Sequence, residues 1–228
     1  MPLAPFLPFI YQVLSPTFPG CLWAGSATSP AIALSFDDGP HPQHTPQLLE
    51  VLDHYQIPAS FFWLGVCVNH SPEIARATYQ RGHWLGLHGY THRSFPRLSA
   101  LELKQSLEQT QIAIAHACQL EMSYVQQQIR DVRPPNGLFT PQTLTYLRQW
   151  NYRPVMWSVV PEDWVQPGVE VVIQRVLQQT CNGSVIVLHD GHHGGVNVAA
   201  IAAQIVPRLL QAGYRFVTVD QLWQQRQL

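Results

Sequence analysis

The sequence predicts an α/β fold in which about seven parallel strands alternate with helices in one domain. Short apolar runs typical of buried strands recur along the 228 residues, and each but the last is followed by a segment with helical features. Motifs rich in Asp, His and Arg come directly after several of these runs. Because ligands bind at the carboxyl ends of parallel strands, the motifs predict a functional site at one edge of a sheet that can close into a barrel.

The strands are expected where short apolar runs are bounded by turn-forming or polar residues, at 31–34, 59–64, 84–87, 131–133, 154–159, 184–188 and 216–219. Helices are expected where apolar residues recur at helical spacing, at 45–52, from 71 onward, and at 99–119, 141–150, 169–179 and 198–211. Thr45-Pro46 and Ser71-Pro72 each supply a cap residue and a first-turn proline. Pro58 and Gly65 bound the aromatic second strand. This alternation favours a parallel sheet.

Composition excludes some classes of function. The chain carries 13 basic and 14 acidic residues, a formal net charge of −1, and its basic residues form no stripe. Nucleic acid is therefore not expected as a partner. The 4 cysteines are far apart and include no Cys-x-x-Cys spacing, which argues against a zinc-thiolate site or a disulfide framework and leaves the compartment open.

The first 36 residues contain no charged side chain. A signal peptide or a membrane-spanning helix is not expected, because the segment lacks a positive start and a long apolar run and is broken by Pro2, Pro5, Pro8, Pro16 and Pro19. We expect residues 1–30 to form an extended apolar arm that packs against a domain formed by 31–228. Contact with a membrane surface or a partner is the alternative. A cytoplasmic and a cell-envelope location both remain open.

Two adjacent carboxylates, Asp37 and Asp38, follow the first apolar strand and precede a Gly-Pro turn. Two like charges would destabilise the core, so the pair is expected at the end of the strand, facing a cleft. Successive strand residues point to opposite faces, so the two carboxylates are expected to differ in role, one holding a metal and the other handling a proton. An ordinary turn is the alternative interpretation.

His88 and His92 lie four residues apart just after the third predicted strand. With Asp38 they form a set of one carboxylate and two imidazoles, which leaves room for water and is typical of catalytic zinc. The spacing alone is weak, because His189 and His193 repeat it. Capping or surface histidines are the alternative.

Three further segments can contribute to a site. Arg133 precedes a stiff Pro-Pro-Asn-Gly turn that can hold a carboxylate and offer a backbone N–H to an oxyanion, although an ordinary loop with a solvated Arg is the alternative. Segments 157–164 and 187–190 place polar groups beside large apolar side chains. A carboxylate beside an imidazole in such a pocket would fix the tautomer and keep the ring protonated, as a general acid requires.

Together, these segments resemble the polysaccharide deacetylase family, also called the NodB-homology or carbohydrate esterase 4 family, over nearly all of 31–220. The resemblance implies a distorted (β/α) barrel. It implies that Asp37 is the general base and that Asp38, His88 and His92 bind the metal.

The same resemblance assigns roles to the later motifs. It implies that Arg133 positions the base, and that His189, next to Asp163, is the catalytic acid. The residues that it places against substrate are Pro135, Asn136, Trp164 and Val187.

The chain departs from the family pattern at five positions: Gly89 in place of Ser or Thr, Arg93 in place of Pro, Asn136 in place of Tyr, Val160 in place of Asp, and Val187 in place of Leu. None of these changes removes a predicted ligand, acid or base, so catalytic activity is expected.

The sequence thus predicts a metal-dependent hydrolase that removes N-acetyl groups from polysaccharides or oligosaccharides containing N-acetylglucosamine, such as chitin-like chains or peptidoglycan. One divalent ion is expected, zinc first, with cobalt or nickel as alternatives. The rival functions are hydrolysis of small non-sugar amides on the same scaffold and carbohydrate binding without catalysis. The oligomeric state is left open.

Overall fold

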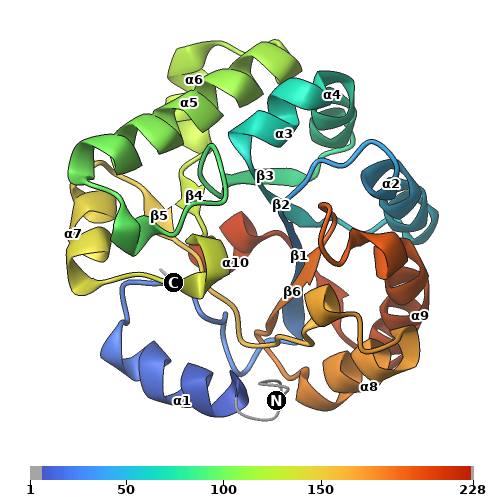
Figure 1. Ribbon diagram of the computed structural model, residues 1–228. Helices are drawn as coiled ribbons and strands as arrows, with labels where there is room; N and C mark the ends of the chain where they lie inside the picture. The colour runs from blue at the N-terminus through green and yellow to red at the C-terminus, as the bar shows by residue number, and fades with distance from the viewer. Residues whose placement is uncertain (1–6, 227–228) are drawn as a thin grey trace.

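The computed structural model describes residues 7–226, and its core is a curled sheet surrounded by helices (Figure 1). The strands are β1 Ala31–Asp37, β2 Ser60–Trp63, β3 Trp84–Leu87, β4 Asp131–Val132, β5 Arg153–Pro154, β6 Val185–His189 and β7 Arg215–Phe216. Their order is β5-β4-β3-β2-β1-β6, with β7 also paired to β1, and these pairings are parallel. The predicted fold class is confirmed.

The segment that follows β5 connects the two outer strands of this order, β5 and β6. Val155 forms a parallel bridge with Leu22, and Val159 forms another with Ile186 of β6. The N–H groups of Ser158 and Val159 both donate to the carbonyl of Val185. The predicted strand at 154–159 is therefore wrong in extent, because only its first residue lies within β5 and the rest crosses to β6.

The helices are α1 Leu7–Thr17, α2 His44–Tyr55, α3 Gly65–His70, α4 Pro72–Gln80, α5 Ala100–Cys118, α6 Met122–Gln128, α7 Pro141–Gln149, α8 Val169–Gln179, α9 Val198–Gln211 and α10 Val219–Arg226. Short 3₁₀ turns lie at η1 Phe95–Arg97, η2 Pro135–Gly137, η3 Asp163–Val165 and η4 Gly195–Asn197. Helices α8 and α9 have the predicted bounds, whereas α1, α3, α6 and α10 were not predicted. The predicted last strand ends early because Val219 begins α10.

Strand β1 is buried along its whole length and separates two apolar regions. Ile32, Leu34 and Phe36 belong to the large core beneath the surrounding helices. Ala31 and Ala33 point the other way and pack with residues such as Phe62 and Val185. Alternation continues along the strand, so Ser35 and Asp37 share the face of the small alanines, which leaves space for polar groups inside the barrel.

The N-terminal arm is not extended as expected, because residues 7–17 form helix α1. Pro8 is the second residue of this helix, where a missing N–H costs no hydrogen bond. Residues 1–6 of the predicted arm lie outside the described residues. No helix of the described part is both long and apolar enough to cross a membrane.

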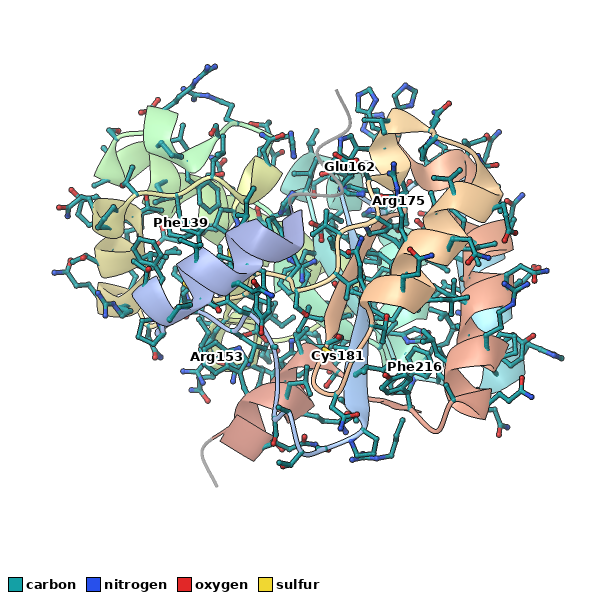
Figure 2. All side chains as sticks on the ribbon, turned by 90° about the horizontal axis from the view of Figure 1, so that it is seen from below. Phe139, Arg153, Glu162, Arg175, Cys181 and Phe216 are labelled. Carbon is teal, nitrogen blue, oxygen red and sulfur yellow. The ribbon has the colours of Figure 1, made fainter. Side chains whose placement is uncertain are left out.

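The expected packing of the arm can be followed from α1 onward. Cys21 and Trp23 form a buried cluster with Leu144 and Met156, and Phe18 meets the ring of Phe139 edge-on, with 5.0 Å between ring centroids. Figure 2 shows α1 lying across this side of the molecule, beside Phe139. Described residues of the arm therefore pack on the barrel wall.

Candidate catalytic centre

Asp37 is the last residue of β1, and its buried carboxylate is held by Arg133, which directly follows β4. Nη1 of Arg133 donates to Oδ1 of Asp37 at 2.6 Å and to Oγ of Ser35 at 2.9 Å. Nη2 donates to the carbonyl of Met156 at 3.1 Å, and the guanidinium lies 4.0 Å from the centre of the Phe62 ring. Burial lowers the pKa of Arg133, and the charge and hydrogen bond of Asp37 oppose this.

Asp38 turns its side chain toward a different set of partners. Its backbone has a φ of 73°, in the left-handed region that Asp tolerates better than most residues. Its Oδ1 lies 3.4 Å from Nε2 of His88 and 3.4 Å from Nε2 of His92. Gly191 is needed beside it, because a Cβ there would lie 2.5 Å from the Cβ of Asp38. The two neighbouring carboxylates thus lie in different surroundings.

The protonation of His88 follows from its buried hydrogen bond. Its Nδ1 lies 2.7 Å from the carbonyl oxygen of Arg133, which can only accept, so Nδ1 carries the hydrogen and Nε2 has a free lone pair. Burial lowers the pKa of His88 to about 3, although the charge of Asp38 opposes it, so the ring is neutral.

A cation fits between these groups. Asp38 Oδ1 is buried and has no hydrogen-bond partner among the described residues, yet it faces the lone pair of His88. One donor atom each from Asp38, His88 and His92 lie within 4.8 Å of one another. Two imidazole nitrogens and one carboxylate oxygen form a donor set that suits zinc and related divalent ions.

His189 ends β6, and the β1–β6 register pairs it with Asp37. Its Nδ1–H donates to Oδ1 of Asp163 at 2.8 Å, and its backbone N–H donates to Oδ2 at 2.7 Å. Burial alone would lower the pKa of His189, but the charge and hydrogen bond of Asp163, with smaller contributions from Asp37 and Asp38, raise it to about 9. The ring is therefore a cation at neutral pH, and Trp164 packs edge-on against it with centroids 5.0 Å apart.

The turn that carries Asp163 is fastened to helix α8. Glu162 precedes it in a left-handed conformation with a φ of 58°. Nη1 of Arg175 donates to the carbonyl of Pro161 at 2.9 Å and lies 3.3 Å from Oε2 of Glu162 (Figure 2). These contacts attach the turn to a helix that packs on the core. The turn is thus held by Arg175 of α8, and the carboxylate of Asp163 by His189 of β6.

One cavity of about 920 Å³ connects most of the predicted residues. Its lining includes Asp37, Asp38, His88, His92, Asn136, Trp164, Val187 and His189. Pro135 is buried at the start of η2 and does not line the cavity, so the structure gives no direct support for its expected contact with substrate. Arg133 and Asp163 lie behind the lining and reach the cavity through Asp37 and His189.

Asp190 was not selected from the sequence, although it directly follows His189. It is fully buried, and burial raises its pKa to about 7. Oγ1 of Thr45 donates to its Oδ2 at 2.5 Å, and Nε1 of Trp63 lies 3.3 Å from both oxygens. A Cβ at Gly39 would collide with this carboxyl group, so Asp190 supports the turn after Asp38. The only signal in the sequence that could have pointed to Asp190 is its position as a carboxylate at the end of a strand, as with Asp37 and Asp38.

A parallel barrel that presents a carboxylate, an imidazolium and a metal-donor set at the carboxyl ends of its strands has the groups that a hydrolase requires. The family model described as polysaccharide deacetylase matches residues 24–155, and the chain belongs to this family. The family and the fold predicted from the sequence are thereby confirmed.

Individual relatives cover most of the chain. A peptidoglycan-N-acetylglucosamine deacetylase of Bacillus cereus is 32% identical over 202 residues, which span 88% of this chain and 91% of the relative. A chitooligosaccharide deacetylase of Bradyrhizobium is 31% identical over 203 residues, which span 84% of this chain and 90% of the relative. The crystal structure of a peptidoglycan N-acetylglucosamine deacetylase superposes with a TM-score of 0.82 at 26% identity, covering 89% of this chain and 92% of that one.

Proposed function

We propose that this protein is a metal-dependent deacetylase that removes N-acetyl groups from chains containing N-acetylglucosamine. The observation that carries the proposal is the pairing of Asp37 with His189 on adjacent strands, beside the donor set of Asp38, His88 and His92. The names of the relatives support the substrate class, since one is a peptidoglycan deacetylase and another a chitooligosaccharide deacetylase.

Asp38, His88 and His92 would hold one divalent ion, zinc first and cobalt or nickel as alternatives. A bound ion supplies Lewis acidity to the amide carbonyl and lowers the pKa of the attacking water. His88 is prepared for this role because its hydrogen bond to the carbonyl of Arg133 fixes the tautomer.

The protein's own residues then divide the proton transfers. Asp37, held by Arg133, accepts a proton from the water that adds to the amide carbon. His189 donates a proton to the leaving nitrogen as the C–N bond breaks, which releases acetate and a free amine. The turn at Pro135 and Asn136 is proposed to present a backbone N–H to the oxyanion.

The first experiment measures acetate release from chitooligosaccharides, peptidoglycan and acetylated xylan, and ring opening of small cyclic amides. Release from the sugar chains that contain N-acetylglucosamine supports the proposal. Ring opening of the cyclic amides without acetate release from the sugar chains would favour the small-amide alternative, and binding of sugar chains without hydrolysis would favour a silent carbohydrate-binding protein.

The metal is tested on the donor set. Elemental analysis of the purified protein should find about one divalent ion per chain, the number that one donor set holds. Asp38→Asn replaces an anionic ligand with a weaker neutral one, so it should lose metal, and added metal should restore part of its activity. Full activity in the presence of a strong chelator would contradict the proposal.

A further inference from the structure

The cavity that holds the catalytic groups has a mostly apolar outer wall. Of the 12 large hydrophobic side chains that are exposed among the described residues, four line this cavity: Ile10, Val66, Leu138 and Trp164. Ile10 and Leu138 keep 37% and 53% of their surface open. Apolar side chains gathered around one cavity, rather than scattered singly, are typical of a binding surface.

Helix α1 supplies part of this wall through Ile10 and Leu14. This helix lies outside residues 24–155, which the family model matches, so this part of the wall is an addition to the matched region. It is held by aromatic packing, with 6.4 Å between the ring centroids of Tyr11 and Trp23, and Trp23 is buried. The wall is therefore fixed to the barrel rather than loosely attached.

The wall also lacks the charges that an anionic ligand would need. No lysine or arginine lies among the described residues that line the cavity. His41 and His192 stand at the rim, and burial together with neighbouring His44 and His192 lowers the pKa of His41. The wall formed by α1 and Leu138 therefore offers an anionic substituent no lysine or arginine that would offset its loss of water.

We propose that α1 and Leu138 form a subsite for an uncharged apolar substituent attached to the N-acetylated sugar, an alkyl or aryl aglycone. The inference rests on the proposed function and specifies its substrate class. The occupant is argued from continuity: the apolar wall and the catalytic groups line one cavity, so a group there is joined to the sugar whose amide is cleaved. Each buried methylene should improve apparent affinity by about fourfold.

The experiment compares the methyl, butyl and octyl glycosides of one chitooligosaccharide, each below its micelle concentration, as substrates of the metal-loaded enzyme. We expect KM to fall at least tenfold from methyl to octyl while kcat changes little, because the substituent adds binding that is equal in the ground and transition states.

Three variants locate the effect. Ile10→Asn and Leu138→Asn should each reduce the ratio of the methyl to the octyl KM, while kcat for the methyl glycoside stays near that of the wild type. Val13→Asn is the matched control, because Val13 lies on the same helix, is 64% exposed and does not line the cavity. Melting temperatures show whether each variant is folded.

The outcomes separate this inference from the proposed function. Deacetylation of all three glycosides with equal KM would overturn the apolar subsite and leave the deacetylase proposal intact. Retention of the octyl preference by both Ile10→Asn and Leu138→Asn would also overturn it. Binding of the protein to neutral phosphatidylcholine vesicles without any chain-length effect would show that the wall contacts membranes instead. If no glycoside and no sugar chain releases acetate, both proposals fail.

Discussion

Two Asp–Arg pairs, each with a buried carboxylate, lie at strand β4, and they are built differently. Asp131 begins this strand and binds Arg153, whereas Arg133 directly follows it and binds Asp37. Nε and Nη2 of Arg153 donate to both oxygens of Asp131, at 2.8 and 2.9 Å. Arg133 reaches only Oδ1 of Asp37. We call Asp131–Arg153 the closed pair, because the arginine bonds both carboxylate oxygens, and Asp37–Arg133 the open pair, because the arginine bonds only one.

The surroundings enlarge this difference. Asp131 also accepts a hydrogen bond from Trp84 at 2.7 Å, and Arg153 reaches Asp220 of α10 at 2.7 Å. By contrast, Oδ2 of Asp37 accepts no hydrogen bond from the described residues, and this side chain lines the cavity. A carboxylate whose oxygens are all bonded stabilises the fold, while one with an open oxygen is available to take a proton.

The largest expected effect tests the open pair. Asp37→Asn should lower turnover by about 10² to 10⁴, the usual contribution of a positioned general base, while the metal content stays near that of the wild type. Kinetics with added metal and elemental analysis check this. If excess metal restores Asp37→Asn, or if its metal is lost as in Asp38→Asn, the assignment of Asp37 to proton transfer is wrong.

The closed pair should respond in the opposite sense. Asp131→Asn leaves the charge of Arg153 with only Asp220 and should lower the free energy of unfolding by about 3 kcal/mol, the low end for a broken buried pair. Turnover per folded molecule should remain near that of the wild type. Urea unfolding and activity measured well below the melting temperature test both parts. A large loss of turnover in the folded variant would contradict the contrast between the two pairs.

A third pair, His189 with Asp163, sharpens the comparison through pH. A general acid must be protonated, so kcat/KM should fall as pH rises through about 9, the raised pKa of His189. Asp163→Asn removes the main charge that raises this pKa, so the fall should move to lower pH. His189→Ala should keep its metal and lose most of its activity. An alkaline limb at the same pH in wild type and Asp163→Asn would refute the pairing.

The same pair has a consequence for stability. The folded pKa of His189 lies above its ordinary value of 6.5, so its contribution to the free energy of unfolding is fully present below that pH. The contribution is lost as pH rises through about 9. Urea unfolding across this range should show the loss in the wild type and a smaller loss in Asp163→Asn.

The smallest expected effect concerns Arg175, which is partly exposed and holds the turn before Asp163 from α8. Arg175→Gln should lower the free energy of unfolding by about 0.5 to 1 kcal/mol and change turnover less than Asp163→Asn does. Arg208→Gln on the surface of α9 is the matched control. An Arg175→Gln variant as inactive as Asp163→Asn would mean that the turn depends on this one side chain.

The sequence was most informative where function and strand ends coincide. The grouping of Asp38, His88 and His92 was expected from motifs that come directly after apolar runs, and the contact of His189 with Asp163 was expected from the resemblance to the family. Their chemical roles remain predictions, since geometry alone does not measure them.

What the sequence did not predict depends on contacts between distant residues. The segment that contains α1 packs on the barrel through aromatic pairs such as Phe18 with Phe139. A local sequence pattern does not predict a partner so far along the chain. Asp190 was missed for the same reason, because its hydrogen-bond donors Thr45 and Trp63 lie 145 and 127 residues away in the sequence. Pro135 was expected to line the cavity because it belongs to the turn that reaches the cavity. Only the residues that follow it, from Asn136 to Leu138, line the cavity.

The pairing of β1 with β6 also makes the proposed catalytic centre depend on segments from both ends of the chain. Ser35 donates to the carbonyl of Ile186 across 151 residues of sequence, at the level of the sheet that aligns Asp37 with His189. The proposed base and metal ligands all precede Pro134, whereas the proposed acid and its carboxylate partner come after Glu162. A nascent chain released before β6 would thus carry donors for a metal and a base, yet no group to protonate the leaving amine. The proposed mechanism therefore requires nearly the whole polypeptide, because it needs β6 to be paired with β1.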